Sequence, residues 1–181
     1  MRRAQLLVAI QAAAIVNPGH PVMVVGSQSI LGTWDESELP WRATMSAEVD
    51  MLPLSGVDEP GFANTIESIA GTQSDFAEKH GFYIDGVDSS TAKLPEGWRS
   101  RLVEVKAGSA IGMCLDPHDL CISKLFANRD QDRDFAAALV QHGLIQPSLL
   151  FDRLGQTEMP AAARKIAGDF IGWLATQELD G

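Results

Sequence analysis

The sequence predicts one α/β (α+β) domain over residues 1–181, with a mixed sheet, flanking helices and a helical C-terminal part. Short apolar and alternating segments are concentrated in a strand-rich core at about 21–115, whereas helical periodicity dominates from about 116 to 181. Hydrophobic residues are 45% and charged residues 21% of the chain, which is typical of a globular protein. No repeat, low-complexity tract or linker divides the sequence.

The N-terminal segment is interpreted as the first helix. Arg2 and Arg3 precede an apolar run at 6–10, a pattern that also fits a signal peptide. That run is shorter than the roughly 7–15 residues of a signal core, so we expect an ordinary helix that ends at 17–19. No apolar run approaches the ~20 residues that span a bilayer, and we expect a cytoplasmic protein with no membrane partner.

The remaining elements follow from periodicity and from turn residues. An apolar run at 21–25 predicts a buried strand that ends at a Gly26-Ser27 turn, where a helix begins. Residues 33–44 show no period and predict a mobile loop. Further strands are predicted at 47–52, 81–84, 101–106 and 111–115, and helices at 62–80 (broken near Gly71), from 116, and at 130–142, 147–154 and 160–177.

Two carboxylates lie on one face of the predicted strand at 47–52. Glu48 and Asp50 are two residues apart, so they point to the same side, opposite Val49 and Met51. A separation of roughly 6.5–7 Å lets both converge on one or two hard cations such as Mg²⁺. A solvated acidic face is the alternative, and spacing alone favours it.

The Gly26-Ser27 turn is a second candidate. Glycine lets a ligand approach the backbone closely, and free N–H groups at a helix N-terminus bind phosphate. An ordinary strand-to-helix turn has the same pattern.

The helices after residue 116 carry two further candidates. Asp116 and Pro117 predict the start of a helix that buries the stripe Cys121, Ile122, Leu125 and Phe126, with Lys124 beside it. Asp132 extends the apolar face of the next helix by one turn, so it is either a helix cap or a site residue paired with a cation. For Lys124 the alternative is a lysine at the edge of the core.

Charge and cysteine content restrict the partners. The formal net charge of −10 disfavours a broad, non-specific surface for nucleic acid, although a local basic pocket stays open. Two cysteines are too few for a disulfide framework and favour a reducing compartment.

In this order, the segments resemble the nucleotidyltransferase superfamily, in which a Gly-Ser turn is followed by an acidic pair on the next strand. The block 114–125, which runs on into Arg129-x-x-Asp132, is similar to the lysine helix of prokaryotic AbiEii-like nucleotidyltransferases, a group that includes toxins of toxin–antitoxin systems. More closely, the chain is similar to an uncharacterised branch of that group. In that branch this helix occurs together with an upstream Leu-Pro-x-Gly-Trp, which is found here at 94–98. The resemblance covers most of residues 21–145.

The resemblance implies a role for each matching position. Gly26 and Ser27 would hold the triphosphate of a nucleoside triphosphate, and Glu48 and Asp50 would bind Mg²⁺. Lys124 would neutralise phosphate charge. Asp132 would orient the lysine or the acceptor. Candidates for a third metal-binding acid are Asp85, Asp88 and Glu104.

The implied reaction moves an NMP from an NTP to an acceptor hydroxyl on RNA, protein or a small molecule, and an antitoxin-like protein is a possible partner. The alternative is a non-catalytic protein of the same fold that binds a nucleotide or a protein.

Overall fold

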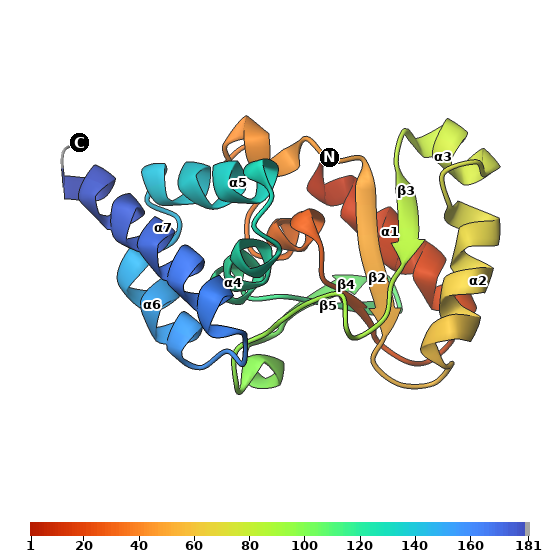
Figure 1. Cartoon of the computed structure of the whole chain (residues 1–181). Coiled ribbons are helices and arrows are strands. Elements are labelled where there is room, and N and C mark those ends of the chain that lie inside the picture. The colour runs from red at the N-terminus through yellow and green to blue at the C-terminus, as the bar shows by residue number, and fades with distance from the viewer. Residues whose placement is uncertain (180–181) are drawn as a thin grey trace.

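A five-stranded mixed sheet is the centre of the computed structural model, which describes residues 1–179 (Figure 1). The strands are β1 (Val22–Val24), β2 (Glu48–Pro53), β3 (Tyr83–Gly86), β4 (Val103–Ala107) and β5 (Ala110–Cys114). Their order is β3-β2-β1-β5-β4. The pairs β1–β5 and β2–β3 are parallel, and the pairs β1–β2 and β4–β5 are antiparallel. The predicted fold class is confirmed.

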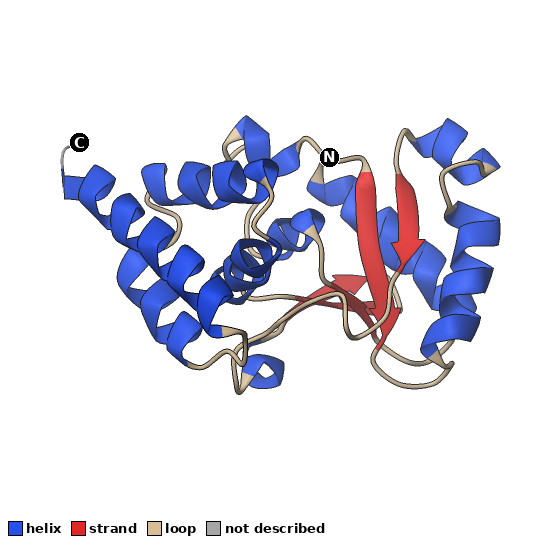
Figure 2. Ribbon diagram, in the orientation of Figure 1, coloured by secondary structure: helices blue, strands red, loops and turns tan. Residues whose placement is uncertain are grey.

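The helices form two groups (Figure 2). They are α1 (Arg3–Val16), α2 (Glu59–Ala70), α3 (Asp75–His80), α4 (Pro117–Ala127), α5 (Asp130–Gln141), α6 (Pro147–Gly155) and α7 (Ala161–Leu179), with 3₁₀ helices η1 (Ser27–Gly32), η2 (Trp41–Thr44) and η3 (Trp98–Arg101). Helices α1 and α2 pack on the sheet, whereas α4 to α7 pack on one another. Within residues 1–179, no helix is long and apolar enough to cross a membrane.

The two faces of β2 differ in chemistry. Val49 and Met51 have no solvent exposure and belong to the core that α1 and α2 cover. Glu48 and Asp50 alternate with them and are half-buried on the opposite face. The predicted alternation therefore places both carboxylates on the side of the sheet that α1 and α2 leave free.

Local signals at its two ends fix the position of α4. The Asp116 carboxylate accepts hydrogen bonds from the backbone N–H groups of His118 (2.9 Å) and Asp119 (3.3 Å), and Pro117 occupies the first turn. Asn128 ends the helix in the left-handed conformation, with φ of 56°. The predicted stripe is buried at Cys121, Ile122 and Leu125 and half-buried at Phe126.

The segment after β1 differs from the expected helix and loop. A six-residue 3₁₀ helix, η1, follows Gly26 in place of a longer helix. Ser29 ties η1 to the entry of α4, because its Oγ accepts a hydrogen bond from Leu115 N at 2.6 Å. Residues 33–44 contain η2 and bury Ala43, and Arg42 forms an ion pair with Asp134 of α5 at 2.9 Å. This segment packs against α5 at one edge of the candidate site.

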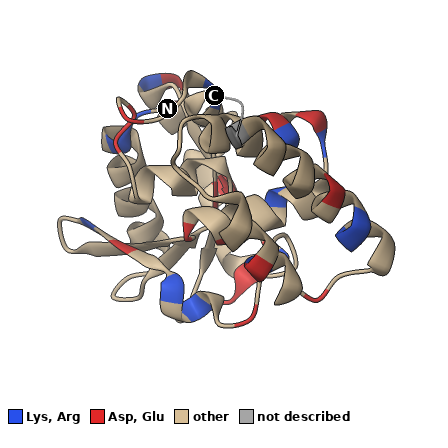
Figure 3. Cartoon of the chain, turned by 90° about the vertical axis from the view of Figure 1, so that its left-hand side faces the viewer, with Lys and Arg blue, Asp and Glu red and all other residues tan. Residues whose placement is uncertain are grey.

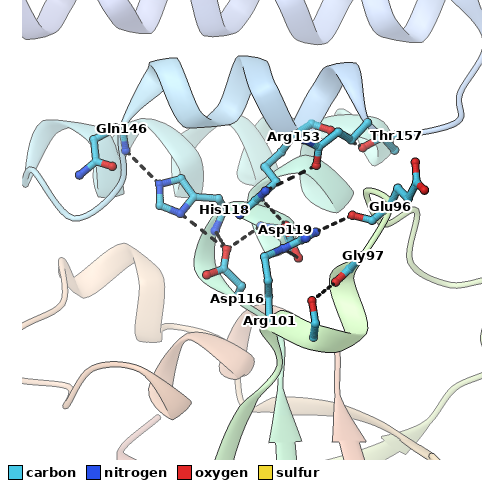
Figure 4. Close-up of polar contacts among 11 residues, drawn as sticks. Glu96, Gly97, Arg101, Asp116, His118, Asp119, Gln146, Arg153 and Thr157 are labelled. Atoms are coloured by element: carbon cyan, nitrogen blue, oxygen red, sulfur yellow. Dashed lines mark hydrogen bonds and ion pairs between the residues drawn. The ribbon is translucent and has the colours of Figure 1, made fainter.

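A buried ion cluster joins the sheet side of the molecule to α4 and α6 (Figure 4). The Asp119 carboxylate of α4 has no solvent exposure and accepts hydrogen bonds from Arg101 Nε at 2.9 Å and Nη2 at 3.2 Å. Arg153 of α6 lies 3.2 Å from the other side of the same carboxylate. Gly97, in the Leu-Pro-x-Gly-Trp segment, begins η3 with φ of 76°, and Glu96 O accepts a hydrogen bond from Arg101 at 3.1 Å. The segment therefore positions the arginine.

Candidate active site

A cavity of about 530 Å³ lies between the β1–β2 part of the sheet and the helices α4 and α5. Predicted site residues that line it are Gly26, Ser27, Glu48, Asp50 and Lys124. Asp132 has no solvent exposure and lies behind the cavity wall, bonded to Lys124 and Arg129, both of which line the cavity. Segments far apart in the chain thus bring the six predicted residues to one place.

Three carboxylates converge on the sheet, and two of them, Glu48 and Asp50, line this cavity. Glu48, Asp50 and Asp85 each offer an oxygen, and these oxygens lie within 4.8 Å of one another. In the described part of the chain, no other set of three His, Cys, Asp or Glu residues converges in this way. Oxygen ligands on opposite sides of one Mg²⁺ are about 4 Å apart, so the donor type and the spacing both fit a hard divalent cation.

Asp85 is the third acid because of how the strands pair. In the parallel register of β2 and β3, Asp50 lies directly beside Asp85. The carboxylate of Asp88 instead accepts a hydrogen bond from Ser90 N at 2.7 Å, within its own loop. Glu104 lies on β4, the opposite edge of the sheet, 3.6 Å from Lys106. Among the three candidates, only Asp85 joins the cluster.

The cluster carries more negative charge than its surroundings neutralise. Burial, followed by the charges of Glu48 and Asp85, raises the pKa of Asp50 from 3.8 to about 6, against the opposing effect of Lys124. Burial and the neighbouring Glu48 carboxylate also raise the pKa of Tyr83. Groups held in this way favour a cation between them.

The Asp50 carboxylate lies directly against the backbone of Gly26. A Cβ atom at residue 26 would be 1.5 Å from Asp50 Oδ2, far inside van der Waals contact. The backbone dihedrals of Gly26 (φ −78°, ψ −168°) are open to any residue. Glycine is therefore required by the carboxylate that lies against it and not by backbone conformation.

The helical side of the cavity presents a fixed lysine. Lys124 Nζ lies 3.1 Å from Asp132 Oδ1 and 4.7 Å from the centre of the Phe135 ring, and its side chain is only 10% exposed. Asp132 also accepts hydrogen bonds from Arg129 Nε at 2.7 Å and from Arg129 N at 3.3 Å. Burial alone would raise the pKa of Asp132, but the hydrogen bonds and charges of Arg129 and Lys124 lower it below its usual value.

The cap interpretation of Asp132 is confirmed, and the carboxylate is also paired with two cations, whereas its role as a site residue stays a prediction. Its bond to Arg129 N caps the first turn of α5, and its bonds to Lys124 and Arg129 hold two cations at the cavity. The contact of Arg42 with Asp134, both lining the cavity, was not predicted. Its partners are 92 residues apart in the chain, and no local pattern marks such a pair.

A mixed sheet with a Gly-Ser turn after β1 and paired acids on β2, facing a lysine, defines a protein of the nucleotidyltransferase class. The family model described as "Nucleotidyltransferase of unknown function (DUF6036)" matches residues 4–156, and the chain belongs to that family. The match includes every candidate site residue. No curated protein and no solved structure matches the chain.

Proposed function

We propose that the chain catalyses Mg²⁺-dependent transfer of an NMP from an NTP to an acceptor hydroxyl, with release of pyrophosphate. The observation that carries the proposal is one cavity in which Glu48 and Asp50 lie across from the fixed Lys124. The carboxylate of Asp85 converges with those of Glu48 and Asp50. Phosphoryl chemistry requires this combination, because cations must neutralise the phosphates and align the attacking oxygen.

The three carboxylates would hold Mg²⁺, since their oxygens converge and their charge is not otherwise compensated. When bound, Mg²⁺ supplies charge neutralisation at the phosphates and alignment of the reacting oxygens. Gly26 allows the chain to pass close to Asp50, so that its backbone and the Ser27 hydroxyl can bind the triphosphate. Because η1 is a short 3₁₀ helix, its dipole contributes little to binding of the triphosphate.

Lys124 would bind phosphate oxygens from the opposite wall. Asp132 acts through it as a positioning residue, because its carboxylate is inaccessible to solvent and restricts the lysine to one orientation. Arg129 adds a second cation at the same wall, with its side chain 63% exposed.

We further propose that the chain is a relative of the AbiEii-like nucleotidyltransferases. Support comes from the Lys124–Asp132 pair, which joins the lysine helix and the Arg-x-x-Asp element in the way that the resemblance implies. A toxin-like role, a cytoplasmic location and a cognate antitoxin-like partner belong to this finer proposal. Co-expression of the chain with its neighbouring gene product tests it, and growth inhibition that this partner does not relieve argues against it.

Calorimetric titration of ATP, GTP, CTP and UTP with Mg²⁺ tests the proposed site. We expect one nucleotide to bind in a Mg²⁺-dependent way and Asp50→Ala to abolish binding. Glu104→Ala is the matched control, because it removes an exposed acid from the far edge of the sheet. Equal binding by wild type and Asp50→Ala would refute the site.

Release of pyrophosphate distinguishes an enzyme from a non-catalytic relative. We expect Mg²⁺-NTP turnover in the presence of a hydroxyl acceptor. Binding without turnover under every acceptor supports instead a protein that has kept the site and lost the chemistry.

A further inference from the structure

A second, smaller cavity of about 120 Å³ adjoins the candidate active site. Val25 and Ala92 line both cavities, so the two share a wall. The floor of the smaller cavity, termed here the apolar chamber, includes Met23 of β1 and Leu52 of β2, and its cover includes Trp98. None of the six predicted site residues that the larger cavity brings together lines it.

The apolar chamber and the acidic cluster occupy one face of β2. Side chains alternate along a strand, so Glu48, Asp50 and Leu52 point to the same side. Glu48 and Asp50 line the larger cavity, and Leu52 lines the chamber with Leu54 just beyond the strand. A molecule in the chamber therefore lies beside the proposed metal-binding carboxylates, further along the same face of β2.

The size of the chamber restricts what it holds. A dry cavity of about 150 Å³ accommodates benzene, so this volume suits one ring-sized group and is too small for a nucleoside. Leu94 and Trp98 are half-buried and form apolar walls, and the guanidinium of Arg99 lies 4.4 Å from the centre of the Trp98 ring. The apolar part of this lining favours an apolar group by desolvation, and Glu59, Asp88, Ser89 and Arg99 form the polar part.

The charges around the chamber disfavour an anionic occupant. Glu59 and Asp88 line it, and Arg99 is occupied with Trp98. The chain carries a net charge of −10, and basic residues lie among acidic ones along the ribbon in Figure 3. A polyanion such as RNA would be repelled by these carboxylates.

We infer that the apolar chamber binds the acceptor, and that the acceptor is an uncharged small hydroxyl compound with one ring-sized apolar group. This inference rests on the proposed nucleotidyl transfer. The acceptor oxygen forms a bond to the α-phosphorus, and the bond from that phosphorus to the oxygen shared with the β-phosphate breaks. Pyrophosphate leaves, and the hydroxyl proton passes to solvent.

Benzyl alcohol is the probe for the chamber itself, and this experiment needs no nucleotide. We expect it to shift the indole N–H resonance of Trp98 in the NMR spectrum of the full chain. Leu54→Gln should abolish the shift, and Ile69→Gln, which alters an exposed residue of α2, should leave it intact. If Leu54→Gln does not fold, Ala92→Phe replaces it, because the added ring blocks the chamber and should also abolish the shift. An unchanged Trp98 resonance in wild type overturns the inference.

Transfer from α-labelled NTP tests the acceptor role. We expect label on benzyl alcohol in preference to glycerol or an RNA with free terminal hydroxyls. Leu54→Gln should raise KM for benzyl alcohol by about tenfold and leave the Kd of Mg²⁺-NTP unchanged. Preferred labelling of RNA or glycerol overturns the inference. A changed nucleotide Kd also overturns it, because the chamber then serves the nucleotide.

The two proposals fail in different ways. A wild-type chain that binds no Mg²⁺-NTP refutes nucleotidyl transfer and the acceptor role together, whatever benzyl alcohol does. A chain that binds Mg²⁺-NTP and loses it in Asp50→Ala, but labels no apolar alcohol, keeps the proposed function and refutes only the acceptor class.

Discussion

The Asp119 side chain is fully buried and that of Asp50 is half-buried, and the two carboxylates differ in the charges around them. Arg101 and Arg153 contact the Asp119 carboxylate from two sides. Asp50 has instead two further carboxylates beside it, and burial together with their charges raises its pKa to about 6. The first arrangement holds parts of the fold together, whereas the second keeps unneutralised charge where a cation can bind.

The largest effect is expected from breaking the compensated cluster. Arg101→Ala should lower the free energy of unfolding by about 3–5 kcal/mol, because it leaves a buried carboxylate with less of its positive charge. Burial raises the pKa of Asp119, and the arginines oppose that effect by favouring the charged form. Urea unfolding measures the loss.

Arg99→Ala is the matched control, since the Arg99 side chain is exposed and lies over the ring of the adjacent Trp98. It should change the free energy of unfolding by no more than about 0.5 kcal/mol. Similar losses in both variants would show that the Asp119 cluster does not hold the fold.

A smaller loss in the free energy of unfolding should follow from a steric clash at the acidic cluster of Glu48, Asp50 and Asp85. Gly26→Ala places a methyl group against Asp50 Oδ2 and should cost about 1–3 kcal/mol, with loss of Mg²⁺-NTP binding as the carboxylate is displaced. Gly155→Ala is the control, because nothing lies within 4 Å of its added Cβ. Thermal unfolding and calorimetry together test both consequences. Nucleotide affinity that survives in Gly26→Ala contradicts the close approach at this turn.

Local signals explain what could be predicted from the sequence. Asp116 and Pro117 are adjacent in the sequence and together mark the start of α4. Alternation along β2 likewise places Glu48 and Asp50 on one face. The choice of Asp85 as third acid required the parallel register of β2 with β3, which no local pattern encodes.

The Arg101–Asp119–Arg153 cluster was not predicted for the same reason. Each charge taken alone has the pattern of an exposed surface residue, and only tertiary packing brings the three together. The expected helix after Gly26 became the short η1 because Ser29 bonds the chain back to Leu115 within a few residues of the turn. Long-range pairing decides both cases.

The Lys124–Asp132–Arg129 group lies between the two extremes, because it is compensated and also faces the cavity. Lys124→Met should weaken Mg²⁺-NTP binding about tenfold or more, through loss of a charged contact. It should lower stability by only about 1 kcal/mol, since Arg129 keeps its bonds to Asp132. Lys106→Met, at an exposed lysine of β4, controls for net charge. Equal nucleotide affinity in the two variants would remove Lys124 from the site.

The smallest expected change in the free energy of unfolding is a gain in stability, from Asp50→Asn. This sign distinguishes the Asp50 carboxylate from that of Asp119. The pKa of Asp50 is about 6 in the folded chain against an ordinary 3.8, so the folded state binds the proton more tightly. Its contribution to stability is therefore complete below pH 3.8 and is lost as the pH rises through 6. Asp50→Asn removes an unfavourable charge at pH 7 and should stabilise the metal-free chain by on the order of 1 kcal/mol, after screening by water in the open cavity.

Melting temperatures at pH 7 and pH 4 test this prediction. Asp50→Asn should raise Tm at pH 7 and leave it nearly unchanged at pH 4. Asp119→Asn should instead lower Tm at pH 7, because it removes the carboxylate that Arg101 and Arg153 contact. Mg²⁺ should raise the Tm of wild type more than that of Asp50→Asn, since the cation relieves the repulsion that the substitution has already removed. A Tm at pH 7 that falls in both variants would mean that Asp50 contributes to folding in the way Asp119 does, and that the acids on β2 are not kept for a cation.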